Sequence, residues 1–367
     1  MEDGSATKTR ALDGLALCQA VPEVPLPPLS GPIGLAVGRS AYRLTLELVE
    51  AARSAAVDLG IQARVVGPLD DRTGLRTLLG IGFQRDFLAV LDAGRNDYPG
   101  CPQIAWVGEP LLPPGETSGG LAARLGRSPL LDLARLPLRP LRGAPLPRPL
   151  ARVRGEMLGE WERYRNTLDL DRAARLCDEL VVTNRVAAAT LARRGLSASV
   201  VPWGYAAAVA GELLSPDMGD RDLAVVALGR TDAWVAWRRR ELARLVASEP
   251  QLTVAENVWG PERNALLRRS RVVLNVQRVP GNFVGLRLLL ALAAGAVVVT
   301  EPMTDPYPFV PGIHYVEAPL DRLLDESRGL LADEKRRRRI AEAGQALLSD
   351  ELTMVNSLRR VLAVAQS

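Results

Sequence analysis

Histidine and lysine are nearly absent from this sequence of 367 residues. His314 is the single histidine, and Lys8 and Lys335 are the two lysines. One histidine excludes the zinc motif H-E-x-x-H and every site with several histidine ligands. Neither lysine stands in G-x-x-x-x-G-K-[ST], so the chain has no P-loop, and neither context indicates a Schiff base. His314 precedes a short predicted strand, where a structural or ligand-edge role is more common than that of a general base.

Cysteine is scarce as well. Cys18, Cys101 and Cys177 are odd in number, far apart and without C-x-x-C spacing. This usage is typical of a reducing compartment. The N-terminal segment MEDGSATKTR lacks the hydrophobic core of a signal peptide. We therefore expect a cytoplasmic protein.

Aromatic residues make up only 4% of the chain, and 46 basic residues are nearly balanced by 42 acidic ones. A nucleic-acid-binding surface needs a basic face with interleaved aromatic side chains, so we expect no nucleic-acid partner. Long hydrophobic runs are missing too. The most apolar stretch contains Arg287, is broken by Gly295 and falls short of the ~20 residues that span a bilayer. The hydrophobic content of 47% instead supports the cores of about two soluble domains.

The stretch from Asn275 to Glu301 has the pattern of a strand, a glycine-containing loop, a helix and a second strand. In an open α/β sheet, such a loop brings backbone N–H groups and a helix N-terminus to the carboxyl edge, where they can neutralise a phosphate. The pattern therefore indicates a nucleotide or nucleotide-sugar site. Because G-x-G-x-x-G is absent, a loop that binds nothing is an equal alternative. The predicted bounds are a strand over 271–277, a helix over 286–294 ended by Gly295, and a strand over 296–300.

The remaining chain alternates between strands and helices, which predicts parallel sheets with helices on their faces. Two such domains in succession predict a ligand site between two carboxyl edges. The expected strands are 33–37, 63–66, 86–91, 103–107, 178–183 and 198–201 in the first domain, and 223–228 and 252–255 in the second. The main expected helices are 41–59, 187–194, 238–247, 261–269, 320–332, 333–348 and 351–365. We expect a disordered or draped leader over 1–30, a first domain over 31–205, a second over 206–349, and a C-terminal helix over 350–367.

Residues 111–154 interrupt the first domain and are rich in proline, leucine and arginine. A run of this length without regular structure is usually a functional lid or an insertion. Its arginines allow contact with an anionic substrate or with anionic lipid. A solvated insertion without membrane contact is the favoured interpretation.

Five segments carry a family resemblance: DELVVTNRVAAATLARRG, VVPWGY, VVALGRTDAWVAWRRRELARL, GLRLLLALAAGAVVVTEP and PGIHYVEAP. In this order and spacing they resemble glycosyltransferases of the GT-B fold, in particular group 1 (family 4-like) enzymes and their spore-maturation-type branch. The resemblance covers about residues 175–365 and reaches the first domain only in general layout. It implies an α/β protein with two Rossmann-like domains that face each other across a cleft, and C-terminal helices that return to the first domain.

The resemblance also implies donor-binding residues. In such transferases a Gly-Arg pair after the first strand of the second domain, and another base at the next helix start, grip the donor diphosphate. Gly229, Arg230 and Arg238 match that arrangement. Fixed cations stabilise the charge that develops on a nucleoside diphosphate leaving group, so we expect neither a metal nor a cofactor besides the donor. The nucleobase is expected beside Asn257 and Trp259.

The glycine-containing loop completes the implied donor site. Backbone N–H groups of Val284, Gly285 and Leu286 at the helix start are expected to contact the phosphates. Asn282 and Phe283 belong to the same loop and are expected on the donor side.

The chain departs from the family at two positions. Retaining group 1 enzymes carry two glutamates eight positions apart, the second of which binds the ribose hydroxyls; the corresponding residues here are Asn282 and Leu290. A leucine cannot accept a hydrogen bond, so ribose binding is supplied otherwise or is absent, and Glu301 cannot be assumed to replace it. Leu288, Leu290 and Leu292 together predict a packed helix rather than the wall of a polar pocket.

Two segments of the first domain are candidates for the acceptor side. Gly38, Arg39 and Ser40 follow the first predicted strand and face the cleft in any GT-B layout. Glu109 follows the strand 103–107 at the same edge, where a carboxylate can be tuned to act as an acid or base on an acceptor hydroxyl. A structural carboxylate that caps the loop is the slightly favoured alternative for Glu109.

Three functions are compatible with these observations. The leading hypothesis is a metal-independent glycosyltransferase that uses a nucleotide-activated sugar, with its acceptor bound by the first domain and residues 111–154. The acceptor can be a natural product, a cell-envelope component or a protein. The alternative is a catalytically degenerate GT-B protein that binds or scaffolds an active transferase. A phosphosugar epimerase is least favoured because it requires several carboxylates and histidines. The sequence does not specify the sugar, the base, the stereochemical outcome or the oligomeric state.

Overall fold

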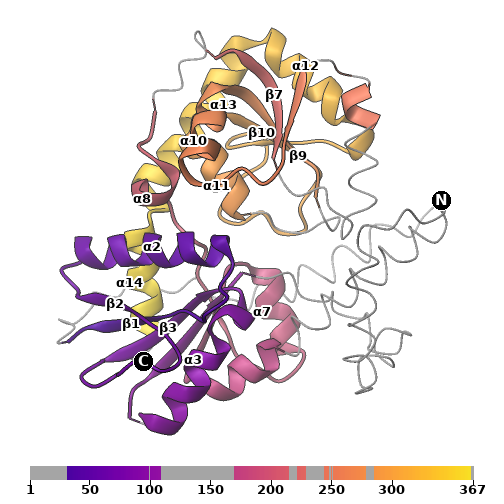
Figure 1. The fold of residues 1–367 in the computed structure, drawn as a ribbon. Coiled ribbons are helices and arrows are strands. Elements are labelled where there is room, and N and C mark those ends of the chain that lie inside the picture. The colour runs from indigo at the N-terminus through magenta and orange to yellow at the C-terminus, as the bar shows by residue number, and fades with distance from the viewer. Residues whose placement is uncertain are drawn as a thin grey trace, which may run out of the picture.

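The computed structural model describes residues 31–98, 100–108, 169–214, 221–228, 244–247, 249, 251–277 and 285–364. These residues form two α/β units, each built on a parallel sheet (Figure 1). Within these ranges no helix combines the length and the apolar character needed to cross a membrane.

The first sheet has the strand order β2-β1-β3-β4-β5-β6, and every pairing is parallel. Its strands are β1 (Ile33–Ala36), β2 (Ala63–Val66), β3 (Thr77–Gly82), β4 (Gln103–Val107), β5 (Glu179–Val182) and β6 (Ser199–Val200). The helices that accompany it are α2 (Arg43–Asp58), α3 (Gln84–Asp97), a helix over 169–176 and α7 (Arg185–Ala192). The short helix α8 (Ala207–Ala210) follows the first sheet in sequence and contacts both α2 and α10 of the second unit.

The second sheet has the order β11-β10-β9-β7-β8, again with parallel pairings. Its strands are β7 (Leu223–Leu228), β8 (Leu252–Ala255), β9 (Ser270–Asn275), β10 (Val297–Thr300) and β11 (Val316–Glu317). Its helices are α10 (Gly260–Arg269), α11 (Gly285–Ala293), the 3₁₀ turn η4 (Leu320–Arg322), α12 (Leu323–Ala332), α13 (Glu334–Ala346) and the π turn η5 (Leu347–Glu351). The last helix is α14 (Met354–Val364).

Counted within each unit, the strands of the second sheet have the order 2-1-3-4-5 from one edge, and the first sheet has the same order with a sixth strand at its end. The direction in which successive strands are added across the sheet therefore reverses between β1 and β3 in the first sheet and between β7 and β9 in the second. Ligands of open α/β sheets bind outside the carboxyl ends of the strands at such switch points. The topology thus locates a candidate site in each unit.

The expected strand over 86–91 is wrong, because Asp86–Leu91 belongs to helix α3. The strand in that part of the chain is β3, and all six of its residues are buried. The sequence pattern did not indicate this strand because it contains two glycines, which are uncommon in strands. A Cβ at Gly80 would lie 2.6 Å from Cγ of Phe87, so the glycine makes room for the buried ring of α3, and Gly82 has φ +103°.

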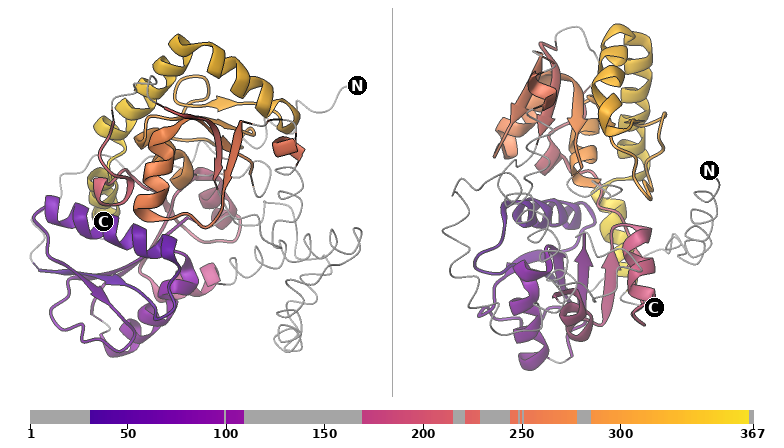
Figure 2. Two further views of the ribbon diagram at one scale, coloured as in Figure 1. Left: turned by 45° about the horizontal axis from the view of Figure 1, so that its top comes forward. Right: turned by 90° about the vertical axis from the view of Figure 1, so that its right-hand side faces the viewer.

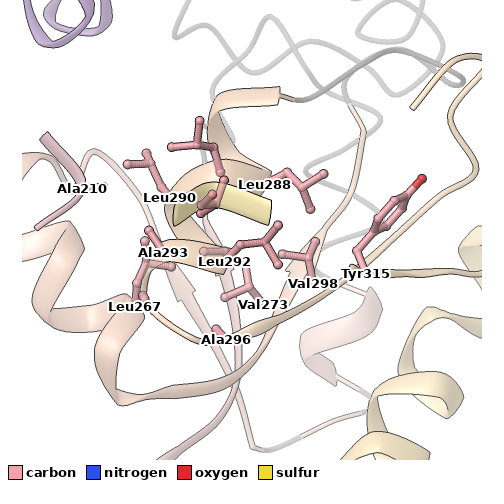
Figure 3. Close-up of a cluster of buried hydrophobic side chains, with 14 of the residues drawn as sticks. Ala210, Leu267, Val273, Leu288, Leu290, Leu292, Ala293, Ala296, Val298 and Tyr315 are labelled. Atoms are coloured by element: carbon pink, nitrogen blue, oxygen red, sulfur yellow. The ribbon is translucent and has the colours of Figure 1, made fainter. Parts of the chain in front are cut away.

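Each sheet is covered by apolar side chains on both faces. Alternate residues of β4 divide between the two faces: Ile104 and Trp106 pack against α2, while Ala105 and Val107 pack on the side of α3. In the second unit the leucines of α11 pack against Leu267, Val273 and Val298 (Figure 3). The continuous burial of these strands is typical of a sheet with helices on both faces.

Helix α14 follows the second unit in sequence but packs in the first (Figure 2). Leu358, Val361 and Leu362 are buried in the cluster that also holds residues of α2 and β1. The chain thus passes between the units twice. The two passages lie together, because the Tyr205 N–H donates to Leu352 O (2.7 Å) and the Met354 N–H donates to Tyr205 O (2.6 Å).

Candidate functional site

The carboxyl edges of the two sheets face each other. Tyr42, which follows β1, packs edge-to-face on Trp259, which follows β8, with ring centroids 5.4 Å apart. Arg185 follows β5 and pairs with Asp305, which follows β10. Each of these contacts joins a segment beyond a strand's carboxyl end in one unit to a corresponding segment in the other.

The segment Gly38–Ser40 follows β1 directly, at the switch point of the first sheet. The Gly38 N–H donates to the backbone oxygen of Asp86, and a Cβ at Gly38 would lie 2.6 Å from that oxygen. Only glycine fits so close to another backbone. Arg39 and Ser40 are exposed beside it.

Asp86 fixes this segment to α3. It is 6% exposed, and its Oδ2 accepts hydrogen bonds from the Tyr42 N–H (3.0 Å) and the Thr45 hydroxyl (2.6 Å). The carboxylate therefore orients the start of α2 and the Tyr42 ring. Sequence analysis missed this residue because it assigned Asp86 to a strand. An acidic residue in the first turn of a helix was the available signal.

Asn257 and Trp259 lie between β8 and α10. Asn257 is exposed and has φ +57°, the left-handed region that asparagine tolerates better than most residues. Trp259 is the N-cap residue of α10 and is partly buried against Tyr42. The structure thus brings one donor-side candidate, Trp259, against the segment that follows the acceptor-side candidates Gly38–Ser40.

A buried hydrogen-bonded group joins the ends of β9 and β10. The Asn275 amide donates to the Thr300 hydroxyl (2.7 Å) and accepts from an Arg287 guanidinium nitrogen (2.7 Å). Arg287 lies in the first turn of α11, so its charge is held at the carboxyl edge of the sheet. Sequence analysis used Arg287 only as evidence against a membrane span.

Gln277 and Glu301 form a second link at the same edge. The Gln277 N–H donates to Glu301 Oε2 (2.7 Å), and the Gln277 side-chain amide donates to the backbone oxygens of Glu301 and Pro302. Gln277 is 0% exposed, and its Oε1 has no hydrogen-bond partner among the residues that the structure describes. Glu301 therefore connects the ends of β9 and β10, at the carboxyl edge where α11 also begins.

Helix α11 is packed as the sequence predicted. Leu288, Leu290 and Leu292 are 3%, 4% and 0% exposed and contribute to one apolar cluster (Figure 3). Gly285 and Leu286 form the start of the helix, at the carboxyl edge, and both are partly exposed. The side chain of Leu290 faces apolar neighbours, so this position offers no hydrogen-bond acceptor.

His314 has a structural environment. Its Nδ1 accepts a hydrogen bond from the Val310 N–H (2.9 Å), and burial lowers its pKa. The neutral His314 ring thus stabilises the loop before β11 by accepting a hydrogen bond from the backbone of that loop. Among the described residues no group of histidine, cysteine, aspartate or glutamate side chains is arranged to hold a metal ion.

Several predicted features lie outside the described residues. They are Glu109, Gly229, Arg230, Arg238, Asn282, Phe283, Val284, the leader 1–30 and the insertion 111–154.

Residues 212–363 match the family model described as glycosyl transferase-like. These residues contain nearly all of the second unit and α14. No curated protein matches the chain.

Solved structures resemble the whole described fold. HepE of Anabaena, solved with UDP and glucose, has a TM-score of 0.57 at 11% identity, with 92% of this chain and 100% of that chain covered. An α-glucosyltransferase in complex with UDP and DNA has a TM-score of 0.54 at 8% identity, covering 92% and 100%. Sucrose-phosphate synthase of Thermosynechococcus elongatus has a TM-score of 0.52 at 13% identity, covering 92% and 98%. The predicted α/β architecture of GT-B type is confirmed.

Proposed function

We propose that the protein is a glycosyltransferase that transfers a sugar from a nucleotide-activated donor to an acceptor. The observation that carries the proposal is the pair of parallel sheets whose carboxyl edges face each other, with a glycosyl transferase-like family match over the second unit. Structural neighbours were solved with UDP, or with UDP and glucose, which supports a nucleotide-sugar donor for this chain.

The donor is proposed to bind the second unit. The topological switch between β7 and β9 is the expected position of its phosphates. Arg230 and Arg238 are proposed to neutralise the diphosphate, together with the backbone N–H groups of residues 284–286. Asn257 and Trp259 are proposed to contact the nucleobase, because they follow β8 beside that switch point. The proposed chemistry uses fixed cations in place of a metal ion.

The acceptor is proposed to bind the first unit. Arg39 and Ser40 are exposed at its carboxyl edge, on a segment that Asp86 holds rigidly. Glu109 follows β4 in the sequence and is proposed as the acid or base for an acceptor hydroxyl. Residues 111–154 are proposed to contribute to acceptor binding. We further propose that the enzyme belongs to the group 1 branch.

Ligand-induced thermal shifts test the donor class. The protein is heated with UDP, GDP, ADP and the corresponding nucleotide sugars, each with and without a chelator. A ligand that binds the folded state raises the melting temperature by mass action. We expect one nucleoside diphosphate and its sugar to raise it, with the same shift in the presence of chelator. The absence of a shift with every nucleotide would contradict the proposal.

The first prediction concerns Arg230. Replacing Arg230 with Ala is expected to weaken nucleoside diphosphate binding by ~1.5–3 kcal/mol, the range for a hydrogen bond to a charged group. Isothermal titration calorimetry measures the change. Arg269→Ala is the matched control, because Arg269 pairs on the surface with Asp222 and not at the carboxyl edge. Equal affinities of wild type and Arg230→Ala would refute the assignment.

A further inference from the structure

Two ion pairs connect the units in a reciprocal arrangement. In the first, Glu47 of α2 reaches Arg263 in α10 of the second unit. In the second, Asp305 of the second unit reaches Arg185 at the start of α7 in the first. Each pair joins a carboxylate of one unit to an arginine in the N-terminal half of a helix of the other.

Glu47 also caps the N-terminus of α10 by accepting a hydrogen bond from a backbone N–H of its first turn. The Arg263 Nη1 donates to both carboxylate oxygens of Glu47, at 2.9 and 2.7 Å, and the Gly260 N–H donates to Glu47 Oε1 at 3.2 Å. The N-cap residue Trp259 supplies no side-chain acceptor to this helix. Glu47 therefore provides, from the other unit, both an acceptor and a negative charge where the helix dipole favours them.

The Asp305 pair neutralises a charge in an unfavourable position. Arg185 is the first residue of α7, where a cation opposes the helix dipole. Its Nε and Nη2 donate to the two oxygens of Asp305 at 2.9 and 2.6 Å. Asp305 is 4% exposed, and the Arg185 guanidinium also lies 4.8 Å from the centre of the Tyr307 ring.

Each unit orients its own half of these contacts. The Arg263 guanidinium also donates to Asn264 Oδ1 in its own helix, and to Val209 O in α8. The Tyr307 N–H donates to Asp305 Oδ1 (3.3 Å). Both halves are therefore held in place before they meet, and little side-chain entropy is lost when they pair. Separation of the units would leave Arg263 and Asp305, each at most 5% exposed, without their charged partners.

We infer that Glu47 and Asp305 are positioning residues that hold the two units in a single closed orientation. This orientation presses Tyr42 against Trp259 and so brings the segment after β1 to the segment after β8. The segments that follow β1 and β8 carry the proposed acceptor and donor contacts, and in this respect the role of the ion pairs rests on the proposed function. The closure itself is a property of the free protein.

The free full-length protein provides the primary test. Small-angle X-ray scattering compares the wild type with Glu47→Gln, Asp305→Asn and the double variant, and hydrogen exchange follows the Gly260 amide. We expect a larger radius of gyration for the double variant and, for Glu47→Gln, Gly260 exchange faster on the order of tenfold. Asp222→Asn is the control, because it breaks an ion pair within the second unit. Circular dichroism verifies that each variant is folded, and the isosteric amides minimise the risk of misfolding.

Kinetics separate closure from the proposed reaction. The assay uses a nucleotide sugar that the wild type accepts as a substrate. The double variant is expected to have a kcat at least tenfold lower, with a smaller change in the donor KM. Both constants are expected to be unchanged in Asp222→Asn. Unchanged scattering and unchanged Gly260 exchange in the double variant would overturn the inference. A protein that closes as described but binds no nucleotide would instead refute the proposed function.

Discussion

Leu290 is the residue that most limits how the proposed donor can bind. In the sequence interpretation it occupies the place of a ribose-binding glutamate, and the structure buries it among Leu267, Leu288 and Leu292. Any hydroxyl placed against it would lose its hydrogen bonds to water and gain none from the protein. Ribose contacts are therefore expected from other groups at the carboxyl edge.

Leu290→Glu tests this environment. The substitution is expected to lower the free energy of unfolding by at least ~3 kcal/mol, because it loses apolar burial and places an unpaired carboxylate in the core. Urea denaturation measures the loss. Leu290→Met is the matched control and is expected to cost less than ~1.5 kcal/mol. A tenfold gain in nucleotide affinity for Leu290→Glu would show instead that the side chain reaches the ribose.

At the level of elements, most of the fold was predictable from the sequence. Gly295 was predicted to end a helix, and it has the positive φ of that role. The strands over 63–66, 103–107, 223–228 and 252–255 have the predicted bounds, because short runs rich in β-branched residues between turns are strong signals. The exception was β3, in which glycines replace the residues that normally mark a strand.

The site was predictable only in part, for a physical reason. Residues in the loops just after strands could be placed at a carboxyl edge, Gly38 from the local pattern and Trp259 from the family resemblance. The Glu47–Arg263 pair joins residues 216 positions apart, and no local pattern records such a contact. Asp86 and Gln277 act through equally specific tertiary neighbours.

Gly80→Ala tests why β3 contains a glycine. The added Cβ would overlap the Phe87 ring, which is 0% exposed and has no space to move. We expect a loss of ~1–3 kcal/mol in the free energy of unfolding, the usual cost of overpacking. Gly329→Ala in α12 is the control, because its Cβ meets nothing within 4 Å and alanine favours a helix. A variant as stable as the wild type would mean that α3 shifts freely on the sheet.

For the whole molecule, the two passages between the units determine how they move. Tyr205 and Thr353 form a parallel bridge, so the passages through 201–206 and 352–354 are hydrogen-bonded to each other. Since α14 is anchored in the core of the first unit, a rotation of the second unit must bend both passages at this bridge. The bridge is therefore the expected hinge, and the Glu47 and Asp305 pairs lie at the surfaces that it brings together.

Gly204→Ala tests the hinge. A Cβ at Gly204 would overlap the carbonyl group of Thr353, so the passages must separate to accommodate it. Because the overlap is with backbone, no side-chain movement relieves it, and we expect a loss of ~1–3 kcal/mol in stability. The backbone amides of Tyr205 and Met354 are also expected to exchange hydrogen faster in this variant, since these N–H groups form the bridge. Gly100→Ala, whose Cβ meets nothing within 4 Å, controls for the substitution itself. Unchanged protection of both amides in Gly204→Ala would show that the passages are not coupled at this point.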